Sequence, residues 1–68
     1  MKWVAWIQHH GSRQWHDVRA SEDFEVVYNA LLKYVRENNL IVRFYILMSN
    51  TTPDALPSDA PGPMELRG

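Results

Sequence analysis

The feature that most constrains the fold is an apolar run of nine residues at positions 40–48, LIVRFYILM. The run is rich in β-branched and aromatic residues, and polar, turn-forming residues stand on both sides of it. With a period of two residues, one face of this segment is wholly apolar and the other carries a single charge, that of Arg43. Such a strand lies inside a sheet, so the rest of the chain must be arranged to cover it.

The chain has 68 residues and no cysteine. This length allows one domain, close to the lower limit at which a single hydrophobic core is sufficient. Because neither a disulfide nor a thiolate zinc site is available, we expect an efficient core or stabilisation by a partner, including a second copy. The apolar stretch at residues 3–7 is too short for a signal peptide or a membrane span, which predicts a cytoplasmic protein without membrane contact.

A hairpin is predicted at the start of the chain. Residues 2–10 contain apolar positions on both faces, which is typical of a central strand. Gly11-Ser12 suits a two-residue turn, after which the more polar residues 13–20 return as an edge strand. The register that follows places these residues opposite each other: Trp6 and Asp17, Val4 and Arg19.

A helix is predicted to follow the hairpin, with Ser21 as its N-cap and three acidic residues in the first turn. Asn38-Asn39 is suited to a left-handed exit from this helix. Apolar residues recur at three- and four-residue spacing and predict a stripe that packs into the core. The stripe consists of Phe24, Val27, Tyr28, Leu31, Leu32, Tyr34 and Val35.

These elements predict the α+β class, with a single small ββαβ domain over residues 1–48. A right-handed crossover through the helix gives a three-stranded antiparallel sheet of order 2-1-3, with the helix on one face. Residues 49–68 contain all four prolines and few bulky apolar residues, which predicts a disordered Pro/Asp-rich tail. In this arrangement the second face of the sheet has nothing to cover it.

The uncovered face is the predicted site of function. Its expected apolar members are Val4, Trp6, Trp15, Ile41, Tyr45 and Leu47, flanked by Arg19 and Arg43. An exposed apolar and aromatic patch on a small protein typically marks an interface, and Trp, Tyr and Arg are enriched in binding hot spots. We therefore expect the protein to act by binding, as a homodimer or against another protein. The predicted contact residues are Trp6, Trp15, Arg19, Arg43 and Tyr45.

Single-stranded nucleic acid is the alternative partner of this face. Exposed aromatic residues flanked by arginines on an antiparallel sheet can stack bases and bind phosphates. The charge balance disfavours this alternative, because residues 1–48 carry six Lys/Arg against five Asp/Glu. Replacement of Trp15 by Ala is expected to weaken association more than folding if the face is free.

No motif predicts catalysis, a cofactor or a metal. His9, His10 and His16 lie near the predicted hairpin end, but the spacing of a helical metal-binding pair is missing. No Ser, Cys or second carboxylate is placed by spacing to complete an acid/base site with these histidines. The sequence therefore predicts a protein that is not an enzyme.

The layout of residues 2–48, a short hairpin, a helix that starts after Ala20-Ser21 and a final strand, is similar to that of small phage-encoded inhibitors. Short anti-CRISPR proteins and the small phage inhibitor of bacterial RNA polymerase are similar in combining so few elements in so short a chain. The resemblance implies a stoichiometric inhibitor of a host protein. Such inhibitors are often strongly acidic, whereas residues 1–48 are nearly neutral, and this departure argues against mimicry of DNA.

Overall fold

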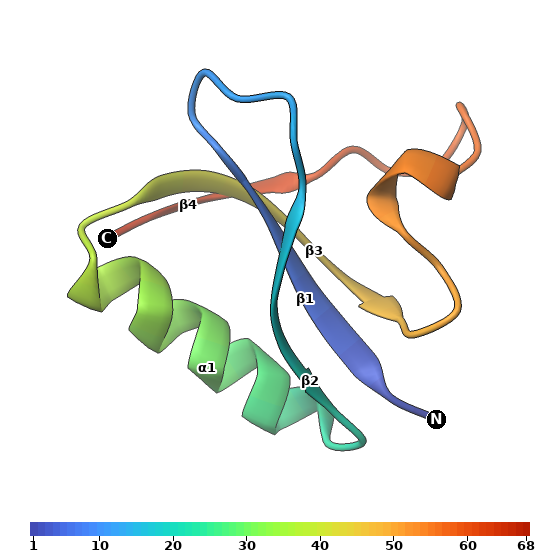
Figure 1. Cartoon of the computed structure of the whole chain (residues 1–68), viewed down its shortest axis with the longest axis horizontal. Coiled ribbons are helices and arrows are strands. Elements are labelled where there is room, and N and C mark those ends of the chain that lie inside the picture. Colours follow the sequence, from blue (N-terminus) through green and yellow to red (C-terminus); the bar gives the residue numbers. More distant parts are fainter.

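The computed structural model describes all of residues 1–68 and contains one α-helix, one short 3-10 helix and four strands. In chain order these are β1 (Trp3–His9), β2 (His16–Ser21), α1 (Phe24–Glu37), β3 (Ile41–Met48), η1 (Pro53–Ala55) and β4 (Met64–Arg67). The strands form one antiparallel sheet of order β2-β1-β3-β4. In Figure 1, α1 covers one face of this sheet and η1 lies on the opposite side.

The predicted α+β class, with one helix on an antiparallel sheet, is confirmed, and the first three strands have the predicted order. Two parts of the prediction are wrong. The sheet has four strands rather than three, and residues 49–68 are not a disordered tail, because they contain η1 and β4. β4 pairs with β3 from Phe44 opposite Met64 to Ile41 opposite Arg67. The C-terminal segment is therefore part of the sheet.

The connection between β1 and β2 is longer than the two residues predicted, since β1 ends at His9 and β2 begins at His16. A turn starts this connection, in which the Ser12 N–H donates to the His9 carbonyl at 3.0 Å. Gly11 is the third residue of that turn and has a φ of +83°, a value that glycine adopts without a steric penalty.

A register shift lies farther along the same hairpin. Ala5 is opposite Arg19, whereas the next residue of β1, Trp6, is opposite Asp17, so Val18 is the extra residue of a β-bulge. The predicted pairing of Trp6 with Asp17 is confirmed. The predicted pairing of Val4 with Arg19 is wrong, because Val4 is opposite Ala20.

The helix begins two residues later than predicted. Asp23, not Ser21, is its N-cap, and the Asp23 carboxylate accepts a hydrogen bond from the Glu25 N–H at 3.0 Å. Ser21 Oγ instead accepts from the Asp23 N–H at 3.1 Å, which orders the approach to the helix. At the other end Asn39 has a φ of +51°, so the predicted left-handed exit is confirmed.

The core lies between α1 and the face of the sheet that it covers. Six side chains are fully buried there: Ala5, Ile7, Val27, Leu31, Val35 and Val42. Phe44, Ile46 and Leu66 pack against them from β3 and β4. The prediction that Phe24 and Tyr28 belong to the core is wrong, since they are 45% and 39% exposed at the margin of the helix.

Candidate functional site

The structure brings three of the five predicted contact residues together on the sheet face opposite α1. Tyr45 of β3 is directly opposite Trp6 of β1. The ring of Trp15, which precedes β2, lies 5.2 Å from the ring of Tyr45 between centroids. This spacing is within the range of favourable aromatic pairs. The predicted aromatic cluster on this face is therefore present.

This aromatic cluster of Trp6, Trp15 and Tyr45 is only partly open to solvent. Residues 49–63 cross from the end of β3 to the start of β4 on this side of the sheet (Figure 1). The Tyr45 hydroxyl donates to the Pro61 carbonyl at 3.1 Å, and all three aromatic side chains are partly buried. The prediction of a fully uncovered face is wrong, because residues 49–63 fold back over its aromatic part, while Ile41 and Arg43 stay exposed.

The cover leaves one polar group without a partner. Trp6 Nε1 is buried and has no hydrogen-bond acceptor. A buried unsatisfied donor costs about 1–3 kcal/mol. The cost of the unpaired Trp6 N–H is offset by the burial of apolar surface of the three aromatic rings.

The two predicted arginines are separated by the β-bulge. Arg19 is opposite Ala5, whose side chain is buried against α1, so Arg19 does not share the face of Trp6 and Tyr45. Arg43 does share that face, since it lies two residues before Tyr45 on β3 and opposite Gln8 of β1. Arg43 is exposed and forms no ion pair.

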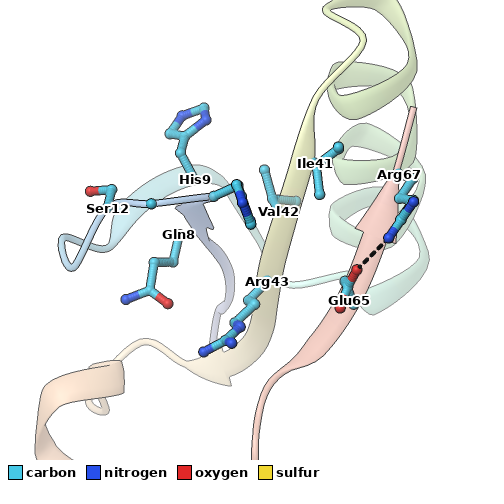
Figure 2. A pocket seen from close by; sticks show the side chains of 10 residues that line it. Gln8, His9, Ser12, Ile41, Val42, Arg43, Glu65 and Arg67 are labelled. Atoms are coloured by element: carbon cyan, nitrogen blue, oxygen red, sulfur yellow. Dashed lines mark hydrogen bonds and ion pairs between the residues drawn. The ribbon is translucent and has the colours of Figure 1, made fainter.

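A polar pocket of about 510 Å³ surrounds Arg43 at the hairpin end of the sheet. Figure 2 shows Gln8, Arg43, Glu65 and Arg67 around this pocket, on strands β1, β3 and β4. Arg67 Nη2 and Glu65 Oε1 are 3.3 Å apart, so one of the two guanidinium groups is already paired. A small anionic group would fit in the pocket at Arg43. Because Glu65 offsets the charge of Arg67, the charge that attracts an anion comes mainly from Arg43.

The outer edge of β3 is only half covered by β4. The terminal bonds of the β1–β3 ladder run from the His10 N–H to the Ile41 carbonyl and from the Ser49 N–H to the Lys2 carbonyl. Odd-numbered residues of β3 therefore direct their backbone groups to β1, and even-numbered residues direct theirs to the β4 side. β4 begins opposite Phe44. Beyond that point the N–H and C=O of Ile46 and the N–H of Met48 face outward with no strand to pair with.

An apolar groove of about 310 Å³ lies beside this open edge. It runs between the N-terminal half of α1 and the β3 edge, and Met64 at its rim is 67% exposed. The aromatic rings of Phe24 and Tyr28 are stacked, with centroids 6.3 Å apart. The side chains that line the groove are Phe24, Tyr28, Phe44, Tyr45, Ile46 and Met64.

The two edges of the sheet differ in how they are protected. β2 carries Asp17 and Arg19 and contains the β-bulge, features that disfavour pairing with a foreign strand. The open half of β3, residues 45–48 (YILM), has no charge, proline or bulge. The open half of β3 and its groove therefore form the candidate site.

Two features of the sequence hide this site. Phe24 and Tyr28 follow the periodicity of the core, and Met64 fell in the segment predicted to be disordered. The only pattern that points to this site is the apolar character of both faces of residues 40–48. It indicates that the strand is central in the sheet, but it does not indicate which half of the strand lacks a neighbouring strand.

Two of the three histidines lie close to each other at the hairpin. The rings of His9 and His16 lie 6.0 Å apart, but no group of three or more His, Asp or Glu side chains converges in the structure. α1 is not long and apolar enough to span a membrane.

Comparison of the chain with protein-family models, with curated proteins and with solved structures finds no match.

Proposed function

We propose that this protein is a small non-enzymatic binding module that takes up an extended protein segment at the open half of β3. The observation that carries the proposal is the set of three outward backbone groups on Ile46 and Met48, on an edge with no protective device. A segment that adds as a fifth strand satisfies all three groups. Main-chain hydrogen bonds then provide affinity without demanding a particular sequence.

Specificity in this proposal comes from the groove. The residue of the incoming strand that lies opposite Ile46 shares its face, and Ile46 faces α1. Its side chain therefore enters the groove between Tyr28 and Met64. An apolar residue is favoured there, and residues two positions away lie on the same face. A module of this kind acts by occupancy, in a one-to-one complex with its partner.

The test is a selection of binding peptides from a displayed random library on the immobilised protein. We expect selected peptides with apolar residues at alternate positions, and we expect them to shift the backbone amide NMR signals of Ile46 and Met48. Met64→Lys places a charge at the groove rim and should weaken binding about tenfold or more, a loss of roughly 1.4 kcal/mol.

The matched control is Val26→Lys. Val26 is 38% exposed on α1 and does not line the groove, so binding should be unchanged. Peptides that bind Met64→Lys as well as the parent protein, or that shift only the amides around Trp15, would contradict the proposed site.

Single-stranded nucleic acid is a second candidate ligand, favoured by the position of Arg43. This unpaired guanidinium lies in the polar pocket beside Gln8 and Arg67, where it is placed to bind a backbone phosphate. Binding of oligothymidine should weaken steeply with salt, and Arg43→Ala should reduce the salt slope by about one. Arg36→Ala, on α1, is the control. Absence of binding at low salt would exclude this candidate.

A further inference from the structure

We infer that the segment that fills the open edge of β3 is the same segment of a second copy of this chain, paired antiparallel about a two-fold axis at Leu47. This inference rests on the proposed function and names its partner. The two sheets then become one continuous eight-stranded sheet. Of the aromatic cluster, only Tyr45 borders the groove at this edge.

The hydrogen-bonding pattern restricts the register of such a pair. In an antiparallel ladder, residues that direct their backbone groups toward each other must be directly opposite. The outward residues of β3 are even-numbered, so Ile46 must face either Ile46 or Met48 of the second copy. If Ile46 faced Ile46, Met48 of the second copy would lie opposite Phe44. That place is occupied by Met64 of β4. Only the pairing of Ile46 with Met48 remains.

This register uses all of the free backbone groups. The Ile46 N–H of each copy donates to the Met48 carbonyl of the other, and the Met48 N–H donates back to the Ile46 carbonyl. The Met48 carbonyl already accepts a bond from the Thr51 N–H at 2.9 Å, and its second lone pair is free for the new bond. The Ser49 N–H is the last to bond β1, and the Thr51 N–H bond to the Met48 carbonyl shows that the chain turns there.

The side chains agree with the same register. Every cross-strand pair is apolar: Ile46 with Met48, Leu47 with Leu47, and Met48 with Ile46. The Leu47 pair is of the non-hydrogen-bonded type, in which the Cα atoms are closest and side chains contact directly. Met48 of the second copy lies opposite Ile46 on the α1 side and so enters the groove beside Met64 and Tyr28. The chain thus carries the residue that fills its own groove.

Two further observations favour a second copy over an unrelated strand. Only six side chains are fully buried, a small core for a chain of 68 residues without disulfides. Self-association adds buried apolar surface where it is lacking. Two-fold pairing uses the same edge in both copies, so the assembly closes as a dimer, and the charged, bulged β2 edge disfavours further growth into a fibre.

The test combines solution mass with site-directed crosslinking. Light scattering over a dilution series gives the mass of the wild-type chain. Leu47→Cys introduces the only cysteine, so any disulfide joins two copies. At the proposed axis the two Cα atoms would be about 4.5 Å apart, within the range that a disulfide spans. Ile41→Cys is the control, because Ile41 lies on the same face of β3, is 44% exposed, and is opposite Arg67 of β4.

We expect a wild-type mass of twice 8.0 kDa at high concentration. In a glutathione redox buffer, Leu47→Cys should form a covalent dimer under conditions that leave Ile41→Cys monomeric. Met64→Lys should restore the monomer mass, and Val26→Lys should not. A wild-type monomer at every concentration, or equal crosslinking at positions 41 and 47, would overturn the inference. A monomer that still binds displayed peptides at Ile46 refutes self-pairing alone; a monomer that binds none refutes the proposed function as well.

Discussion

Leu66→Ala tests whether the C-terminal strand contributes to the stability of the domain. Leu66 is opposite Val42 in the β3–β4 ladder and packs against the core, with only part of its surface exposed. A fully buried leucine costs about 2–5 kcal/mol when replaced by alanine. Because Leu66 lies at an edge that can relax, we expect a loss of about 2 kcal/mol. For a domain of this size that corresponds to a fall in melting temperature of roughly 10 °C.

The assay is thermal unfolding followed by circular dichroism at a single protein concentration, so that any self-association is held constant. The matched control is Glu65→Ala on the same strand. Glu65 is exposed and its ion pair with Arg67 is at the surface, so the change should stay within about 0.5 kcal/mol. A melting temperature of Leu66→Ala equal to that of Glu65→Ala would refute the docking of β4 and support the disordered tail that composition predicts.

Three other substitutions test local features. Trp15→Ala removes a partly buried ring that packs 5.2 Å from Tyr45, so it should destabilise folding by about 2 kcal/mol in urea unfolding, whereas a free Trp15 would leave the midpoint unchanged. Asp23→Ala removes the N-cap bond to Glu25 and should cost about 1 kcal/mol by the same assay; no change would mean that the helix begins elsewhere. Gly11→Ala meets no atom within 4 Å, so its expected loss of about 1 kcal/mol is due to the positive φ alone, and a stabilised variant would contradict that turn.

The parts of the fold that local patterns determine could be predicted from the sequence. The stripe of α1, the two-sided apolar character of β1 and β3, and the short connections between them lead to the order β2-β1-β3. Even for these elements, the residue at which an element begins was not predictable. Both Ser21 and Asp23 are good N-caps, and only the structure shows that Asp23 takes the role while Ser21 orders the residues before it.

The C-terminal segment could not be predicted because its order is supplied by the rest of the chain. β4 has four residues, too few for a reliable alternating pattern, and Pro63 stands directly before it. Its backbone finds partners only on β3, and Leu66 gains burial only from the core. Composition measures what a segment can bury by itself, so it predicts disorder for a segment that docks on a preformed edge.

The predicted site depended on the same missing information. The pairing of Trp6 with Asp17 and the neighbourhood of Trp15 and Tyr45 were predictable from alternation. The exclusion of Arg19 was not, because a one-residue bulge changes the face of a side chain and leaves no signal in the sequence.

The position of the proposed binding site follows from where residues 49–63 end and β4 begins. Residues 49–63 cover the aromatic cluster, and the four residues of β4 that follow reach only from Ile41 to Phe44 on β3. A longer β4 would have closed the sheet edge, and a shorter one would have left the core open at Leu66. The segment that partly covers the predicted aromatic interface thus leaves Ile46 and Met48 as unpaired strand positions beside an apolar groove. Because the other edge is charged and bulged, this half-strand is where association with another strand is physically favoured.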